Sequence, residues 1–278
     1  MKNRVKNLLI ASAVLTCVGL SADSTFAQDR YKKGYTYFSI LTTKMNYTSN
    51  YTSSGGGILN DGDKVKTDAT STNPVYVTGG LYPFNDSFDV STEVSTTLTP
   101  QRAKETSKVN GSKAMTNYSD MLSNNIQLLC HYKITDAHRI VFGGTYNFSS
   151  YKRYKFVQAN GVNLNLGVTE QRSTSIALQT GYWYEGYYDS KVHINFRALV
   201  GYGAWVHTEN TDSDKTFNNN GGYNGDLYLS VGYELFTDKE LGLLTGYSIQ
   251  HRVGASSGHV HLPENTTTNL YLGVYVAF

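Results

Sequence analysis

The feature that most constrains this chain is a two-residue period of apolar side chains, which recurs from Gly34 onwards. Successive side chains of a β-strand point to opposite faces, so this period predicts strands with one apolar and one polar face. Such stretches occur at 34–48, 74–84, 87–99, 122–134, 138–150, 172–187, 191–207, 223–236, 240–253 and 267–278. The sequence therefore predicts an all-β fold of about ten antiparallel strands, with twelve and eight strands as alternatives.

The connections between these stretches alternate in length. Tight turns are expected at 85–86, 135–137, 188–190 and 237–239, and long loops at 49–73, 100–121, 151–171, 208–222 and 254–266. Short turns at one end, long loops at the other and an even strand number are typical of an outer-membrane barrel. The layout predicts a transmembrane antiparallel up-and-down β-barrel with surface-exposed loops. A secreted all-β sandwich, which shows similar alternation, is the alternative.

The two faces of each strand test this prediction, because positions that face lipid must be apolar while lumen positions can be polar. One late strand passes clearly, with Leu227 and Val231 on one face and Asp226 on the other. The first strand is the least clear, because Phe38 and Leu41 lie on opposite faces and both are apolar.

The amino terminus indicates export. Residues 1–27 have the basic, apolar and small-residue parts of a secretory signal peptide, with cleavage predicted after Ala27. Lipidation at Cys17 is the alternative. The barrel domain would then be 28–278, located in the cell outer membrane, and Cys130 would be its single cysteine, so no internal disulfide is expected.

Composition agrees with a strand-rich membrane protein. The formal net charge of +2 gives no support for nucleic-acid binding. The chain has 23 tyrosines and 26 glycines but only 4 prolines. Tyrosine favours strands and concentrates at membrane interfaces, where the ring lies among headgroups and the hydroxyl stays hydrated.

The final stretch carries a recognisable pattern. Tyr271, Gly273, Val276 and Phe278 resemble the carboxyl-terminal signal of outer-membrane proteins that the barrel-assembly machinery reads. This resemblance implies that the assembly machinery is a partner during biogenesis and that outer-membrane lipid surrounds the mature protein.

Charged residues of both signs occupy positions expected to face the lumen. A barrel of about ten strands is only modestly wider than the eight-stranded barrels whose interiors side chains fill, so these charges are expected to pair across the lumen and block it. A small diffusion channel is the alternative. The residues are Asp89, Glu93, Lys133, Arg139, Arg197, Asp226, Glu234 and Arg252.

Ten strands with five long outer loops resemble the omptin proteases of Gram-negative outer membranes, and the segment Gly203-Ala204-Trp205-Val206-His207 is similar to the omptin segment at that place. The resemblance implies an aspartate pair in the second outer loop and an Asp-His couple in the fourth. Here Glu105 and Asp120 are far apart, and no histidine accompanies Asp212 and Asp214. We therefore assign no catalytic residue and keep an omptin-like surface protease as the alternative.

Candidate residues for other catalytic or metal chemistry are equally few. A serine hydrolase needs a serine beside a histidine, yet Ser150 and His138 lie at opposite ends of one predicted strand. His259 and His261 share one face of the last loop but fall short of a tetrahedral ligand set. No metal and no cofactor is assigned.

Cations flank the predicted outer rim, where phosphorylated lipid headgroups lie. We expect these side chains to contact lipopolysaccharide phosphates through charge-assisted hydrogen bonds. A hairpin signal at Asn160-Gly161 also predicts that two strands project beyond the bilayer. The expected role is non-enzymatic, structural or in surface interaction. The cations are Arg102, Lys104, Lys152, Arg153 and Lys155.

Overall fold

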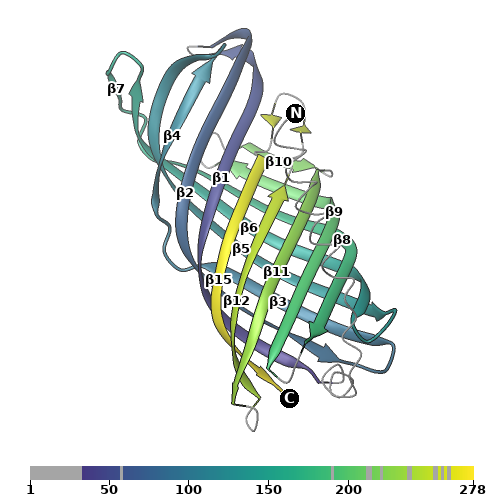
Figure 1. The fold of residues 1–278 in the computed structure, drawn as a ribbon. Coiled ribbons are helices and arrows are strands. Elements are labelled where there is room, and N and C mark those ends of the chain that lie inside the picture. Colours follow the sequence, from purple (N-terminus) through teal and green to yellow (C-terminus); the bar gives the residue numbers. More distant parts are fainter. Residues whose placement is uncertain are drawn as a thin grey trace.

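The computed structural model of the 278-residue chain is an antiparallel barrel (Figure 1). It describes residues 33–56, 59–188, 191–210, 215–219, 222–236, 240–252, 256–257, 260–261 and 264–278. The predicted leader at 1–27 lies outside these residues. Within the described ranges, no helix is long and apolar enough to cross a bilayer.

Ten of the fifteen strands in the described residues hydrogen-bond in a closed ring, as the alternation predicts. The strands are β1 (Tyr35–Gly56), β2 (Leu59–Pro83), β3 (Phe88–Thr97), β4 (Arg102–Val109), β5 (Ser112–Lys133), β6 (His138–Gln158), β7 (Asn163–Leu164), β8 (Thr169–Tyr187), β9 (Val192–Asn210), β10 (Lys215–Asn219), β11 (Tyr223–Phe236), β12 (Leu241–Arg252), β13 (Ser256–Ser257), β14 (Val260–His261) and β15 (Glu264–Ala277). The ring runs β1-β2-β3-β5-β6-β8-β9-β11-β12-β15 and back to β1. The predicted ten-stranded up-and-down barrel is confirmed.

The ring closes where β15 pairs with β1, from Tyr35 opposite Ala277 to Thr48 opposite Glu264. Gly273 faces Ser39 in this seam, and a Cβ atom on it would lie 2.1 Å from the Ser39 Oγ. The same Cβ atom would lie 2.2 Å from the backbone carbonyl oxygen of Phe38, which cannot rotate away, so a larger residue at this position would push the two strands apart.

The outer face of the barrel is apolar, as spanning strands require. In the first strand Phe38 and Ile40 are outward and exposed, whereas Leu41 packs inside against Val75 and Val77. This settles the face that the sequence leaves ambiguous: part of the lumen wall is itself apolar. The outward apolar set includes Val94, Ile126, Leu128, Ile140, Phe142, Leu178, Val200, Leu227, Leu229, Val231, Leu243, Leu270, Leu272, Val274 and Val276.

The predicted long loops at 49–73 and 100–121, and much of that at 151–171, are corrected by the structure: most of their described residues are strand. β1 and β2 pair as far as Gly56 and Leu59, and β4 and β5 meet in a tight turn at 110–111. β4 extends the line of β3, since both lie between β2 and β5 on either side of a break at 98–101. At the opposite end, the described tight turns at 84–87 and 134–137 fall where the sequence predicts them, whereas residues 189–190 and 237–239 of the two other predicted turns lie outside the described residues.

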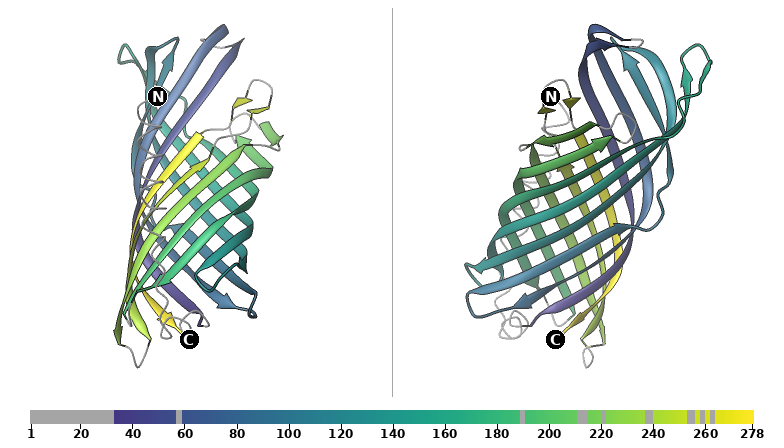
Figure 2. Two further views of the ribbon diagram at one scale, coloured as in Figure 1. Left: turned by 45° about the vertical axis from the view of Figure 1, so that its right-hand side comes forward. Right: turned by 180° about the vertical axis from the view of Figure 1, so that it is seen from behind.

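These extended strands form a projecting wall on one side of the barrel. We use this name for the upper parts of β1, β2, β4, β5 and β6 together with β7, which rise beyond the other strands (Figure 2). The end with tight turns is called the turn end, and the opposite end the hairpin end. The projecting wall has a small apolar core of Met45, Tyr47, Ala69, Ala103, Met121 and Tyr151.

Candidate functional site

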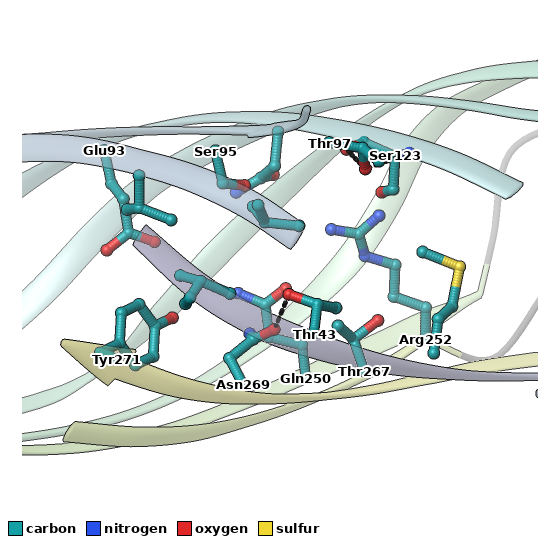
Figure 3. A pocket seen from close by; sticks show the side chains of 15 residues that line it. Thr43, Glu93, Ser95, Thr97, Ser123, Gln250, Arg252, Thr267, Asn269 and Tyr271 are labelled. Carbon is teal, nitrogen blue, oxygen red and sulfur yellow. Dashed lines mark hydrogen bonds between the residues drawn. The ribbon is translucent and has the colours of Figure 1, made fainter. Parts of the chain in front are cut away.

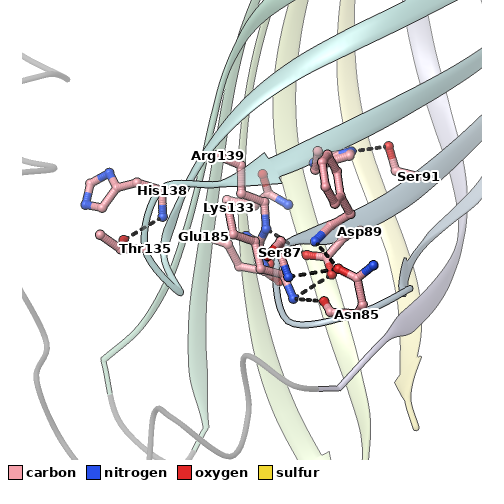
Figure 4. Close-up of polar contacts among 12 residues, drawn as sticks. Asn85, Ser87, Asp89, Ser91, Lys133, Thr135, His138, Arg139 and Glu185 are labelled. Carbon is pink, nitrogen blue, oxygen red and sulfur yellow. Dashed lines mark hydrogen bonds and ion pairs between the residues drawn. The ribbon is translucent and has the colours of Figure 1, made fainter.

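Near the turn end, charged side chains from neighbouring strands pair inside the lumen (Figure 4). Asp89 on β3 receives Lys133 Nζ at 2.7 Å and Arg139 Nε at 2.9 Å, and Arg139 also reaches Glu185 at 2.9 Å. His193 lies 3.4 Å from Glu185. This lower network joins β3, β5, β6, β8 and β9.

A second cluster, the upper network, surrounds Arg197, whose side chain is 2% exposed. Its Nη2 donates to Asp226 at 2.8 Å and its Nη1 donates to Gln127 at 2.9 Å. Glu93 lies 3.6 Å from the same Nη1 and accepts the Tyr37 hydroxyl at 2.6 Å. The guanidinium also makes cation–π contacts with two aromatic rings: its Cζ lies 5.1 Å from the centre of the Tyr228 ring and 5.6 Å from the centre of the Trp183 ring.

The two networks bring together six of the charged residues that the sequence selects for the lumen. Glu234 is also buried on the lumen side of β11, whereas Arg252 lies apart near the hairpin end. Glu185 and His193 belong to the lower network but escape the sequence selection. Their alternation with apolar neighbours on β8 and β9 is the signal that could have identified them. Bulky charged and aromatic side chains therefore fill the middle and lower lumen.

Above the upper network the lumen contains a small cavity of about 30 Å³ (Figure 3). Glu93 and Tyr271 line its lower part, and Arg252 reaches in from β12. Apolar side chains line it from β1 and β2, and hydroxyl and amide side chains line it from the strands on either side of these two. The apolar residues are Leu41, Met45, Val75 and Val77, and the hydroxyl and amide residues include Ser95, Ser123, Asn125, Gln250 and Asn269.

Beside this cavity, β1 and β6 meet across the inside of the projecting wall. The rings of Tyr47 and Tyr151 lie 4.8 Å apart, and Arg153 donates to the Tyr47 hydroxyl and to Glu105, each at 2.8 Å. Asn117 donates to the same carboxylate at 2.6 Å. Arg153 therefore faces inward, which corrects its expected contact with lipid phosphate: its guanidinium is already held by Glu105.

The other expected lipid contacts remain on the outer surface. Arg102 lies over the Tyr118 and Tyr154 rings, and its Nε donates to the Tyr154 hydroxyl at 2.9 Å. That hydroxyl donates to Asp120 at 2.9 Å. Lys104 and Lys152 are exposed nearby, and Lys155 is exposed at an irregularity of β6 where its φ is 55°.

Arg102 and Lys152 stand just above the apolar band. Each lies beside Asp120 in the strand register, and the next outward residues below it on β5 are Leu122, Asn124 and Ile126. Two residues of strand advance about 7 Å, so each of these cations lies one such step above the level of Leu122.

The residues of the predicted assembly signal lie in the closing strand. Tyr271 points into the lumen and bonds with the Ser248 hydroxyl at 2.9 Å, whereas Val276 and Phe278 are outward and exposed. Gly273 makes the close approach to Ser39 described above. Their recognition by the assembly machinery stays a prediction.

The acids considered for proteolysis do not converge. Glu105 points into the projecting wall and pairs with Arg153, while Asp120 points outward to Tyr154. The carboxylates therefore lie on opposite sides of one sheet. Asp212 and Asp214 are outside the described residues. Trp205 and His207 of the omptin-like segment stack on the barrel exterior, with ring centres 5.9 Å apart.

The remaining candidates for chemistry stay separate. Ser150 donates to Glu170 at 2.9 Å near the hairpin end, whereas His138 lies near the turn end. Among described side chains, no three of His, Cys, Asp or Glu are grouped as a metal site requires. His259 and the side chain of His261 lie outside this part of the chain.

No protein-family model matches this chain, and no curated protein matches it at a significant level. The outer membrane protease OmpT from Escherichia coli has a similar structure, with a TM-score of 0.64 and 11% identity over 88% of this chain and 97% of OmpT. Weaker likenesses include OprG from Pseudomonas aeruginosa (TM-score 0.36, 14% identity, 89% of this chain and 97% of that one) and the attachment invasion protein Ail from Yersinia pestis (TM-score 0.32, 8% identity, 88% and 99%). The likeness to OmpT, at this identity, is one of fold. The chain has the fold of an outer-membrane β-barrel.

Proposed function

We propose that this chain is exported through a cleaved signal peptide, assembled into the outer membrane, and acts there as a closed barrel in surface interaction. The observation that carries the proposal is the pair of ion networks across the lumen. Arg139 and Arg197 are both almost fully buried and each bridges two carboxylates. Moving either side chain aside would leave buried carboxylates unpaired, which is strongly unfavourable.

Surface interaction is the role that fits the rest of the molecule. The projecting wall extends the strands beyond the apolar band and presents mostly Thr, Asn, Ser and Lys on its outer side. Proteolysis of the OmpT kind finds no support in Glu105 and Asp120, because a water molecule cannot lie between carboxylates on opposite sides of a sheet.

Planar-bilayer recording on the refolded protein tests the closed lumen. We expect no stepwise conductance from the intact protein. The double variant Arg139→Ala/Arg197→Ala, if it still inserts, should show conductance, because two bulky side chains leave the lumen. Steady channels from the unchanged protein would contradict the proposal. Cleavage of dibasic peptides by the same preparation would instead favour the protease.

We further propose that lipopolysaccharide is a partner at the outer rim, through Arg102, Lys104, Lys152 and Lys155. Arg102 is oriented by two tyrosine rings, so less side-chain entropy is lost when it binds a phosphate. Asp120 lies beside Arg102 and Lys152 in the register, so phosphate must compete with this carboxylate.

Thermal unfolding with and without added lipopolysaccharide tests the rim. We expect a rise in Tm for the unchanged protein, and a smaller rise for Arg102→Gln/Lys152→Gln. The double variant Lys33→Gln/Lys133→Gln, whose cations pair with Glu240 and Asp89 near the turn end, serves as the charge-matched control. An equal rise in all three proteins would exclude these cations as the contact. If lipopolysaccharide gave no rise in Tm, the proposal of a closed lumen would not be affected.

A further inference from the structure

Three lysines lie side by side on the outer face of the projecting wall. Lys66 on β2 is the register partner of Lys108 on β4, and Lys108 is in turn the partner of Lys113 on β5. All three side chains are exposed. We call this set the lysine row. It crosses three strands of the wall that rises above the barrel in Figure 2.

The lysine row is an unfavourable arrangement for the fold by itself. Side chains directly opposite each other in antiparallel strands have Cβ atoms about 4.5–5.5 Å apart, and like charges at such positions destabilise the sheet. The Lys66 Nζ has a carboxylate within reach, since it lies 3.4 Å from Asp68. Lys108 and Lys113 form no ion pair with the residues that the structure describes. A bound polyanion would offset their repulsion.

The nearby carboxylates do not neutralise the row. Asp63 accepts hydrogen bonds from the Asn110 side chain at 2.8 Å and from the Asn60 backbone at 2.9 Å. Asp68 also accepts the Thr48 hydroxyl at 3.0 Å. The other exposed charges around the row are the cations Lys64, Lys104 and Lys155 and the carboxylate Asp61. Cations therefore exceed carboxylates on this part of the wall.

Hydroxyl and amide groups accompany the lysines. Thr106 and Thr116 are register partners, and Thr106 lies two residues below Lys108 on β4. Asn50 on β1 is exposed and lies opposite Lys66. Hydroxyl and amide groups both donate and accept hydrogen bonds, as the hydroxyl groups of a sugar require. The surface therefore combines the positive charge that attracts a polyanion with the polar groups that suit a sugar backbone.

The same face is poorly suited to a nucleic acid, which would also be attracted by its charge. Single strands are held by stacking of their bases on aromatic rings. The outward aromatic side chains below the row are Tyr118 and Tyr154, and Arg102 already lies over both rings. The bases would therefore find little free ring surface here.

The lysine row stands well above the outer rim. Lys108 follows Arg102 on β4 by six residues, which corresponds to about 20 Å along a strand. A partner of the row therefore comes from outside the membrane that holds the barrel.

We propose that the lysine row binds a linear acidic polysaccharide, which lies across β2, β4 and β5. Its sulfate or carboxylate groups pair with Lys66, Lys108 and Lys113, and its hydroxyl groups bond with the neighbouring threonines. The inference names a partner for the surface interaction proposed above and rests on that role.

Biolayer interferometry on the refolded protein in detergent tests the row, with dextran sulfate, alginate and uncharged dextran as probes. We expect both acidic polysaccharides to bind, and dextran to bind at least about tenfold more weakly, because it lacks the charged groups. The tighter acidic probe identifies sulfate or carboxylate as the preferred group. Binding should weaken as NaCl rises from about 50 to 500 mM, since salt screens exposed charges.

Variants make the assignment specific. Lys108→Gln/Lys113→Gln should weaken dextran sulfate binding roughly 3- to 30-fold. Lys33→Gln/Lys191→Gln, which removes the same charge near the turn end, is the matched control and should bind like the unchanged protein. Asp68→Asn should strengthen binding about 2- to 5-fold, because it removes a competing carboxylate. A misfolded variant would not produce such a gain.

Thermal unfolding without polysaccharide separates binding from a structural role. Lys108→Gln should leave the Tm unchanged or raise it, because a contact between like charges is removed. A clear fall in Tm would assign this lysine to the fold and contradict the proposal.

Three binding results would overturn the proposal: equal affinity for dextran and dextran sulfate, full binding by Lys108→Gln/Lys113→Gln, or equally tight binding of a single-stranded DNA of the same charge. Complete displacement of dextran sulfate by lipopolysaccharide would also overturn it, by placing the partner in the barrel's own membrane. None of these results bears on the closed lumen, which conductance measures separately.

Discussion

The lower barrel and the projecting wall are built from the same strands, yet their inner and outer faces have exchanged chemistry. On β5 the lower barrel turns Leu128 outward and Gln127 inward, whereas higher up Asp120 is outward and Met121 is inward. β1 shows the same reversal, from outward Ile40 to outward Lys44. The medium outside the sheet explains the change: hydrocarbon accepts only apolar groups, while in water the apolar groups gather inside.

One strand can therefore contribute to an interior of paired charges in its lower part and to an interior of apolar side chains in its upper part. In the lower barrel the fold is held by hydrocarbon outside and paired charges inside. In the projecting wall it is held by a small apolar core. Substitutions of one kind should therefore have opposite effects in the two regions.

The largest effect should come from removing the central cation of the lower barrel. Arg197→Met leaves Glu93 and Asp226 buried without their shared partner, and we expect a loss of about 3–5 kcal/mol in the free energy of unfolding. Urea unfolding in lipid vesicles, followed by tryptophan fluorescence, measures it. Arg172→Met, at an exposed ion pair, should lose less than about 1 kcal/mol. Equal losses in both variants would mean that the lumen is not a low-dielectric interior.

A reciprocal exchange on one face of β1 locates the membrane boundary. Ile40→Lys should cost about 2–4 kcal/mol, because it places a charge on the lipid-facing band. Lys44→Ile, four positions along the same face, should change stability by less than about 0.5 kcal/mol. The same unfolding assay applies. Similar costs for the two changes would place the boundary elsewhere on β1.

A smaller effect is expected in the core of the projecting wall. Met121→Ala removes a side chain that is 0% exposed, which should cost about 2 kcal/mol, the low end for such deletions. We expect faster proteolysis near the turn at 110–111 with the heat-modifiable gel mobility of the barrel retained. Met115→Ala, a half-buried methionine on the same strand, is the control. Loss of the whole barrel in Met121→Ala would show that wall and barrel unfold as one unit.

The smallest effect concerns an exposed pair at the rim. Hydrogen bonds from Arg172 lower the pKa of the Glu170 carboxyl from its ordinary value of 4.5. The stabilisation is therefore present above the unfolded pKa and is lost as the pH falls through the lower, folded pKa. Arg172→Gln should remove this acid dependence, at a cost of less than about 1 kcal/mol at neutral pH. An unchanged pH profile of unfolding would mean that the pair is screened by solvent.

The sequence predicts the lower barrel well and the projecting wall poorly, for one physical reason. Alternation marks a strand only where the two faces meet different media, as at Leu227 and Asp226. Above the bilayer Thr70 and Thr72 face water, so β2 there carries too little apolar contrast to be read as a strand. Its hydrogen-bond ladder with β1 nevertheless continues to Leu59.

The candidate site is likewise predicted only in part. Charges on inward positions, such as Asp89 and Arg139, can be selected from parity along the strands, but their partners cannot. Arg153 illustrates the limit. Its basic and aromatic neighbours in the sequence indicate a position on the outer rim, but its place in the alternation along β6 points its side chain inward to Glu105. The surroundings of Arg252 depend on which strands the ring brings together, and no single segment of the sequence shows which strands these are.

The seam between β1 and β15 joins the earliest strand of the barrel to the latest. Until Gly273 settles against Ser39, both β1 and β12 present unpaired backbone edges, which readily add strands from other chains. Closure must also bring together segments separated by most of the polypeptide, a slow event for any chain. The growing protein is thus most vulnerable to misassembly just before its final strand docks, and anything that shields those two edges would protect it.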